Sequence, residues 1–276
     1  MDRRTLLLGT LGIGPLGIGP LGSLATAGTL AGPASAQDAT GKPDTAKGLK
    51  IVPRSGPLAG EPLYTNSHAV LIGISKYQHL SSDKQLKYAR KDAEDVRALL
   101  VKSFGFPESN ITLLVDEGAT KRSIETAIGR LNRTLATDRV LIFFSGHGMS
   151  VRGSDGDIGM LVPFDANVNL SGTTADGVTD CILMNSVWEL LDLAPAKHRL
   201  LIADACFSGL LAKPRALEPF SPESLKLLTT QKALQAITAS GKAEISKESD
   251  GFRNGIFTRK FLDVLEEMAG APGQVL

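Results

Sequence analysis

Apolar and polar positions along this chain form two kinds of segment that alternate from about residue 66 onward. Mainly apolar runs predict strands at 68–74, 111–115, 139–144, 199–203 and 233–239. The first of them is apolar without alternation, which predicts a buried strand of the kind found in parallel sheets. Between these runs, apolar or small residues recur at helical spacing over 86–100, 120–135, 180–193 and 257–268. This alternation predicts a three-layer α/β/α sandwich around a mostly parallel sheet.

Two polar segments interrupt the alternation, and each begins a few residues after a predicted strand. Residues 149–179 contain five glycines, and residues 210–230 contain three prolines. Long connections within a compact domain are usually functional or disordered. Because both segments begin near strand ends, we expect them to form irregular walls of a substrate cleft.

The first 36 residues predict a targeting segment. Arg3 and Arg4 precede an uncharged stretch over 5–32, and Ala34-Ser35-Ala36 forms a cleavage pattern of the A-x-A kind. Adjacent arginines point to the bacterial twin-arginine export route. An uncleaved membrane anchor is the alternative, but the glycines and prolines of the stretch disfavour a spanning helix. We therefore expect a cleaved signal over 1–36 and a periplasmic or secreted mature protein.

Composition predicts where the folded domain begins and which partners it binds. Residues 37–65 are rich in proline and glycine, which predicts a linker before a folded domain over 66–276. The net charge of +1, without a basic stripe, and the 5% aromatic content argue against a nucleic-acid surface. We expect protein or peptide substrates, and no stable membrane insertion once the signal is removed.

Two glycine-containing turns carry the candidate chemistry. Residues 145–148 (SGHG) follow the third predicted strand, and residues 204–209 (DACFSG) follow the fourth. An α/β sheet presents functional groups at its carboxyl edge. The thiol of Cys206 is a candidate nucleophile there, with His147 as its general base. The backbone N–H groups of Gly148 and Cys206 are candidates to stabilise the oxyanion.

Each of these residues has a plainer interpretation when it is taken alone. A lone histidine after a strand is more often structural, and a lone cysteine is more often a small buried hydrophobe. His147 and Cys206 together favour catalysis, because each ends an apolar run, is flanked by glycine and serine, and the histidine precedes the cysteine by 59 residues. Cys181 lacks such a setting, and we interpret it as structural, at the start of a helix.

The two turns resemble those of caspase-like peptidases, and of metacaspases and their bacterial relatives (orthocaspases) in particular. Five further segments support the resemblance over residues 66–268: Leu71-Ile72-Gly73-Ile74, Lys91-Asp92-Ala93, Leu161-Val162-Pro163-Phe164-Asp165, Ile237-Thr238-Ala239-Ser240 and Gly255-Ile256-Phe257-Thr258. The resemblance implies a caspase-like fold and endopeptidase activity through a dyad of His147 and Cys206.

The residue two positions before Cys206 bears on substrate specificity. Caspases carry glutamine there and cut after aspartate, whereas this chain has Asp204 and is similar to metacaspases, which cut after basic residues. A carboxylate in the first specificity pocket (S1) repels an acidic P1 side chain and favours arginine or lysine. The resemblance adds Ser145 and Asp92 to this pocket. For Asp92, a charge on a solvated helix face is an equally supported interpretation.

Two other functions are disfavoured by the same residues. A catalytically silent caspase-fold binding module is disfavoured because the chain retains both His147 and Cys206. A peptidase that cuts after aspartate is disfavoured by Asp204.

Calcium is the cofactor that the resemblance raises, because many metacaspases need it. The loop after the histidine offers Asp155 and Asp157, and residues 207–213 contain no carboxylate. Calcium takes six to eight oxygen ligands. We therefore expect no metal site and no other cofactor.

Overall fold

The computed structural model describes residues 63–170, 177–205, 231–239 and 248–270. The chain divides into two units, 1–44 and 45–276, and every described residue belongs to the second. The predicted signal, most of the predicted linker and the candidate nucleophile Cys206 lie outside the described residues. No described helix is both long and apolar enough to span a membrane.

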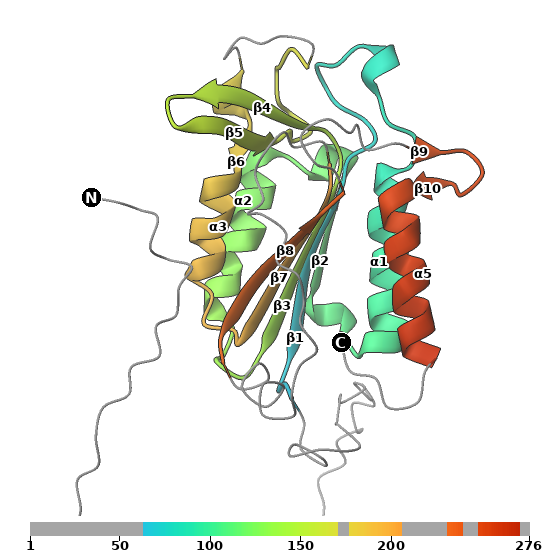
Figure 1. Ribbon diagram of the computed structural model, residues 1–276, viewed down its shortest axis with the longest axis vertical. Helices are drawn as coiled ribbons and strands as arrows, with labels where there is room; N and C mark the ends of the chain where they lie inside the picture. Colours follow the sequence, from blue (N-terminus) through green and yellow to red (C-terminus); the bar gives the residue numbers. More distant parts are fainter. Residues whose placement is uncertain (1–62, 171–176, 206–230, 240–247, 271–276) are drawn as a thin grey trace, which may run out of the picture. The chain divides into compact units, whose positions relative to one another are not determined.

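Five parallel strands form the central sheet in the order β2-β1-β3-β7-β8 (Figure 1). They are β1 (Ser67–Gly73), β2 (Ile111–Val115), β3 (Arg139–Ser145), β7 (His198–Asp204) and β8 (Ala233–Thr238). Each strand lies within one residue of a run predicted from the sequence, so the strand prediction is confirmed.

Helices cover both faces of this sheet, with α1 and α5 on one face and α2 and α3 on the other (Figure 1). They are α1 (Ala89–Phe104), α2 (Lys121–Gly129), α3 (Met184–Asp192) and α5 (Ile256–Gly270). Along the strands, Leu71 and Phe143 pack with α1 and α5, whereas Ile72 and Phe144 pack with α2 and α3. Burial of both faces explains the apolar runs of β1, β3 and β7, whereas the edge strands β2 and β8 are half-exposed. The three-layer prediction is confirmed.

Helix boundaries differ from the predicted ones where capping decides them. α1 begins at Ala89 instead of 86 and runs to Phe104, where Gly105 ends it with a φ of 67°. α2 begins after Thr120, whose side chain accepts the Ser123 N–H, and a 3-10 helix replaces its predicted last turn. The 3-10 helices are η2 (Ser82–Lys84), η3 (Glu108–Asn110), η4 (Asp116–Gly118), η5 (Arg130–Arg133) and η6 (Val178–Asp180).

The expectation of an irregular wall over 149–179 is wrong for the first part of that segment. β4 (Gly148–Gly153) and β5 (Gly156–Leu161) form an antiparallel hairpin, and β6 (Ile182–Leu183) pairs with β5. The hairpin turns just before Gly156, whose φ of 135° suits glycine. Many side chains of β4 and β5 are half-exposed, so their sequence signal is weaker than that of the central strands. The other predicted wall, 210–230, lies outside the described residues.

Cys181 does not begin a helix, which corrects the prediction for 180–193. The helix starts only at Met184, because η6 and β6 precede it. The Cys181 thiol is buried and lies 3.7 Å from Met149 Sδ. Burial raises its pKa to about 11, which supports a structural interpretation.

A second small antiparallel pair precedes α5. It consists of β9 (Glu248–Ser249) and β10 (Asn254–Gly255). β10 contacts both α1 and α5, and Gly255 approaches the Asp204 carboxylate at the end of β7. The β9–β10 hairpin therefore reaches the carboxyl edge of the central sheet.

Candidate active site

The two strands that lead into the candidate turns end side by side at the carboxyl edge of the sheet. β3 and β7 are adjacent parallel strands, and Ser145 pairs with Asp204 at their ends. The Gly146 N–H donates to the Asp204 carbonyl oxygen at 3.3 Å and so joins the turns beyond the last strand pair. His147 lies two residues after the end of β3, and Ala205, one residue before Cys206, is the last described residue after β7. The fold thus brings the SGHG turn next to Asp204, the first residue of the second candidate turn.

His147 has one ring nitrogen bonded to a backbone carbonyl. Its Nε2 lies 2.7 Å from the Lys84 carbonyl oxygen. A carbonyl can only accept a hydrogen bond, so Nε2 carries the proton, and Nδ1 is the basic nitrogen of the neutral ring. Burial lowers the pKa of the imidazole below its ordinary value, although the hydrogen bond to Lys84 opposes this. His147 is therefore neutral near pH 7 and suited to act as a base.

Tyr77 holds His147 from another direction. The His147 backbone N–H donates to Tyr77 Oη at 2.7 Å, and the two ring centroids are 5.0 Å apart. A Cβ at Gly146 would lie 2.8 Å from Tyr77 Oη, so the turn needs glycine here. Burial raises the pKa of Tyr77 well above its ordinary value, which keeps the hydroxyl protonated. Tyr77 is not identifiable from the sequence, because a tyrosine shortly after a strand is not a specific signal.

The segment between β1 and α1 delivers both Tyr77 and the Lys84 carbonyl. The Gln85 side chain fixes this segment by hydrogen bonds to the backbone of two other residues in it. Its Oε1 accepts the Tyr77 N–H at 2.7 Å, and its Nε2 donates to the carbonyls of Tyr77 at 3.1 Å and Leu80 at 2.8 Å. Gln85 is therefore a second residue of the site that sequence reasoning missed.

Asp116, at the end of β2, holds the beginning of the same segment. Its Oδ1 accepts the backbone N–H groups of Ser75 at 2.8 Å and Lys76 at 3.0 Å. Asp116 is buried and has a φ of 43°, which is costly for a residue other than glycine. These hydrogen bonds offset the backbone strain and fix the point at which the segment leaves β1.

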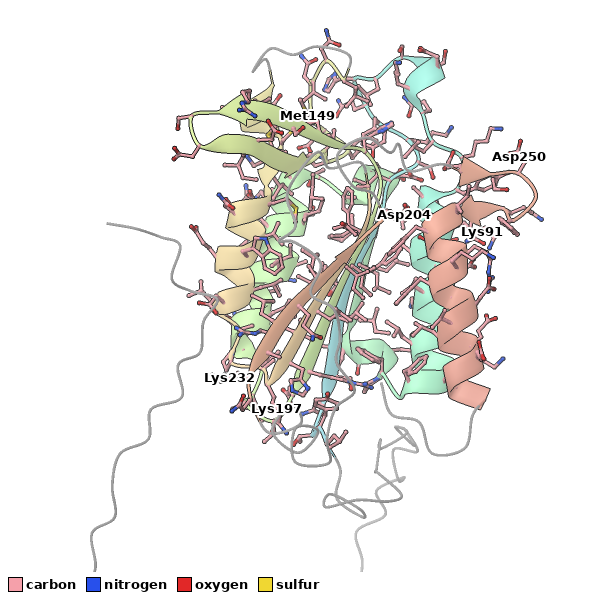
Figure 2. The ribbon with its side chains drawn as sticks, in the orientation of Figure 1. Lys91, Met149, Lys197, Asp204, Lys232 and Asp250 are labelled. Atoms are coloured by element: carbon pink, nitrogen blue, oxygen red, sulfur yellow. The ribbon has the colours of Figure 1, made fainter. Side chains whose placement is uncertain are left out.

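Three residues predicted for the S1 pocket gather beside the turns: Asp92 from α1, Ser145 from β3 and Asp204 from β7. Their exposed fractions are 1%, 4% and 3%, respectively. Ser145 Oγ donates to Asp92 Oδ2 at 2.9 Å, and Figure 2 shows Asp204 at the upper end of the sheet. The interpretation of Asp92 as a charge on a solvated helix face is therefore wrong.

The segment from Asn254 to Thr258 supplies further hydrogen bonds to both carboxylates. Asn254 Nδ2 donates to Asp92 Oδ1 at 2.8 Å, and the Gly255 N–H lies 3.1 and 3.2 Å from its two oxygens. Thr258 donates to Asp204 Oδ2 from its N–H at 3.1 Å and from Oγ1 at 2.7 Å. A Cβ on Gly255 would lie 2.3 Å from Asp204 Oδ2, so only glycine fits. In the sequence, residues 255–258 stand out only as part of the resemblance to caspase-like peptidases.

Asp92 is buried without a cationic partner among the described residues. It accepts hydrogen bonds from a hydroxyl, a side-chain amide and a backbone N–H, and Lys91 pairs with Asp95 instead. Burial is the main cause that raises the pKa of Asp92 to about 7, and the nearby charge of Asp204 raises it further. A cationic group beside Asp92 would favour the ionised form of this carboxyl.

The remaining predicted residues lie around the β4–β5 hairpin. Gly148 directly follows His147 and begins β4. Asp157 pairs with Arg152 at 3.1 Å, and Asp155 occupies the hairpin turn. Within the described ranges, no three His, Cys, Asp or Glu side chains gather in a way that could hold a metal ion.

Comparisons with known proteins indicate a single family for this chain. The family model of the caspase domain matches residues 66–275. Metacaspase-4 of Arabidopsis thaliana is 31% identical over 154 residues, which are 51% of this chain and 33% of that protein. Metacaspase-1 of Eremothecium gossypii is 28% identical over 156 residues, or 52% and 32% of the two chains. These matches span about a third of the length of the curated relatives.

A solved structure shares the fold. The crystal structure of protein GSU0716 from Geobacter sulfurreducens aligns with a TM-score of 0.51 at 19% identity. The alignment covers 73% of this chain and 82% of that chain. At this identity the likeness concerns the arrangement of the sheet and helices alone.

Proposed function

The chain belongs to the caspase-domain family of cysteine-type peptidases, and from this premise we propose that it is an endopeptidase that cleaves after arginine or lysine. His147 and Cys206 form the catalytic dyad in this proposal. The observation that carries it is the hydrogen bond from His147 Nε2 to the Lys84 carbonyl. That bond leaves Nδ1 as the base at the sheet edge where the chain continues from β7 to Cys206.

In the first half of the proposed reaction, His147 Nδ1 takes the proton of the Cys206 thiol. The sulfur attacks the scissile carbonyl carbon, and the backbone N–H groups of Gly148 and Cys206 stabilise the oxyanion that forms. The C–N bond then breaks, and the proton on Nδ1 passes to the leaving amine. A thioester with Cys206 remains.

In the second half, water replaces the amine. His147 Nδ1 accepts a proton from water as its oxygen attacks the thioester carbon. The C–S bond breaks, the acid product leaves, and the proton returns to the sulfur. The Lys84 carbonyl supports both halves, because it holds the ring in one orientation and stabilises the imidazolium formed in each.

The buried carboxylates support a basic P1 side chain. The exposed fractions of Asp92 and Asp204 are 1% and 3%, and the Gly255 backbone approaches both carboxyl groups. An arginine or lysine side chain that enters this pocket gains a charge partner, whereas an aspartate would add a third negative charge. The same pocket therefore disfavours cleavage after aspartate.

The proposal extends to cofactors and location. We propose activity without calcium, because the acidic residues near the site are engaged with protein donors or lie in an exposed hairpin turn. We also propose export to the periplasm, on the basis of the twin arginine and the A-x-A pattern.

The test is hydrolysis of fluorogenic peptides that end in Arg, Lys or Asp, with and without calcium. We expect cleavage of the Arg and Lys peptides, and loss of nearly all of it in both Cys206→Ala and His147→Ala. Cys181→Ala and His79→Ala are matched controls, because Cys181 packs in the core and His79 is exposed. Both controls should retain activity.

The alternatives give different results in the same assay. Cleavage of the Asp peptide alone would indicate a caspase-type specificity, and folded protein that cleaves none of the peptides would indicate a silent binding module. Retention of more than a few per cent of activity in both dyad variants would refute the assignment of His147 and Cys206.

A further inference from the structure

Glu248, in β9, binds the chain just ahead of α1. Its Oε1 accepts the backbone N–H groups of Lys87 at 3.0 Å and Tyr88 at 2.6 Å, and its Oε2 accepts that of Lys87 at 2.9 Å. Glu248 and Lys87 are 161 residues apart in the sequence. Backbone donors ahead of a helix favour a carboxylate, because they point outward and the helix dipole is positive there.

This contact lies close to the group that orients His147. The Lys84 carbonyl, which accepts the His147 Nε2–H, precedes Lys87 by three residues. Between them, the Gln85 side chain and the hydrogen bond from the Leu86 N–H to the Ser75 carbonyl (2.9 Å) fix the backbone. Displacement of residues 87–88 would therefore be transmitted over a short, well-bonded segment to the Lys84 carbonyl.

Charged groups from several elements surround the imidazole. Lys84 of η2 disfavours the protonated ring and Glu248 of β9 favours it, while burial disfavours it most. Tyr77 packs against the His147 ring, and its hydroxyl is neutral. The Asp204 backbone carbonyl accepts the N–H of Gly146, one residue before His147. Among the described carboxylates, Glu248 is therefore the one whose charge raises the pKa of His147.

We propose that Glu248 is a positioning residue for His147: it anchors the segment that presents the Lys84 carbonyl, and its charge stabilises the imidazolium. Its consequence for turnover rests on the proposed peptidase function.

The alternative is that Glu248 merely fastens the hairpin to α1. Asp250 offers the comparison, because it fastens the same hairpin through side chains alone. Its carboxylate bonds to Lys87 Nζ at 3.1 Å and to the Tyr88 hydroxyl at 2.8 Å. Figure 2 shows Asp250 on the outer part of this hairpin, away from Asp204.

The experiment is an NMR titration of the histidine rings in the wild type, Glu248→Gln, Glu248→Ala and Asp250→Asn. The chain has four histidines, and a His147→Gln sample assigns the signal. Gln keeps an oxygen for the two N–H donors but loses the charge. We expect the His147 midpoint to fall by roughly half a pH unit in Glu248→Gln and at least as much in Glu248→Ala. In Asp250→Asn it should stay at the wild-type value.

Kinetics on an Arg peptide provide the second readout. We expect kcat to fall roughly tenfold in Glu248→Ala with KM within a factor of two, because the base is misplaced while the S1 pocket is kept. An unchanged His147 midpoint in Glu248→Gln, or a loss confined to KM, overturns the proposal. If the wild type cleaves no peptide, the proposed function fails, and the titration alone decides the role of Glu248.

Discussion

Asp92 and Asp204 bring two negative charges to one buried position. Gly255 allows this approach, because a Cβ there would lie 2.3 Å from Asp204 Oδ2 and 3.0 Å from Asp92 Oδ2. The hydrogen bonds from Ser145, Asn254 and Gly255 favour the ionised form of Asp92, but burial outweighs them. In the proposed S1 pocket, these two carboxyl groups would favour a cationic side chain over a neutral one of the same shape.

Replacement of Asp204 tests the charge of the pocket. We expect Asp204→Ala to lower kcat/KM for an Arg peptide by the equivalent of at least about 2–3 kcal/mol, or roughly 30- to 150-fold, because a buried charge partner is lost. Asp204→Asn keeps the shape and should lose the preference for Arg over Gln at P1. If either variant cleaves Arg peptides at the wild-type rate, the carboxylate does not line the pocket.

Replacement of Asp92 tests its raised pKa. The pKa rises from an ordinary value of 3.8 to about 7 in the folded protein. Between these values the folded protein binds a proton that the unfolded chain releases, so Asp92 makes the fold less stable as pH rises toward 7. Relative to Asp92→Asn, the wild type should lose about 1 kcal/mol or more of unfolding free energy between pH 5 and pH 8.

Urea unfolding at the two pH values measures this difference. Glu94→Gln is the control, because it removes an exposed carboxylate from the same helix, and its effect should be the same at both pH values. A difference between wild type and Asp92→Asn that does not change with pH would show that Asp92 ionises normally. In the same pH range, KM for Arg peptides should decrease as Asp92 becomes charged.

The segment between β1 and α1 acts as one element although it contains little regular structure. Asp116 holds its beginning, Gln85 its middle and Glu248 its end. Its backbone carbonyl at Lys84 and the ring of Tyr77 both contact His147. The geometry of the base is therefore decided by an irregular segment whose position three separate side chains fix.

Removal of Gln85 tests whether this element must be rigid. Gln85→Ala leaves two carbonyls and one N–H without their partner, so we expect a loss of about 1–3 kcal/mol of unfolding free energy. We also expect kcat for an Arg peptide to fall at least roughly tenfold. Urea unfolding and steady-state kinetics provide the two measurements.

Gln78→Ala is the matched control, because Gln78 lies in the same segment with its side chain exposed. It should change neither quantity. A Gln85→Ala variant that is destabilised but turns over at the wild-type rate would mean that the Lys84 carbonyl is held by other contacts.

The molecule as a whole gathers the site at one edge of a parallel sheet. All five central strands end at that edge, and the segments after β1 and β3 and the end of β7 meet there with the β9–β10 hairpin. The hydrophobic cores on the two faces hold the strands in register, so segments far apart in sequence reach fixed positions. Because side chains from all of these segments bond to one another, the site depends on the intact domain.

The fate of the N-terminal residues is a prediction about the whole protein. Expressed in a bacterium with a twin-arginine pathway, the mature protein should begin near Gln37 and appear in the periplasm, because Arg3-Arg4 and Ala34-Ser35-Ala36 frame an uncharged segment. N-terminal sequencing of fractionated cells measures both. The double variant Arg3→Lys, Arg4→Lys should stay in the cytoplasm. An intact N-terminus in a soluble cytoplasmic fraction of the wild type would contradict the prediction.

The sequence by itself determined the strands of the central sheet, the presence of helices on both faces and the SGHG turn at the edge of the sheet. Continuous apolar runs such as 139–144 occur only where both faces are buried, so local composition suffices to place them. The candidate roles of His147 and Asp204 also rest on local context, namely a glycine-containing turn directly after such a run. Helix ends and the β4–β5 hairpin were less well predicted, because capping and half-exposed strands leave weaker patterns.

Only the tertiary structure decided which groups act on these residues. Asp92 has the helix position of a surface charge, and its burial follows from the approach of Asn254 and Gly255, more than 160 residues later. The Lys84 carbonyl reaches His147 as a backbone atom, so no side-chain pattern marks it. Such contacts depend on where distant segments pack against one sheet edge, and that packing follows from the burial of the whole core and not from local propensity.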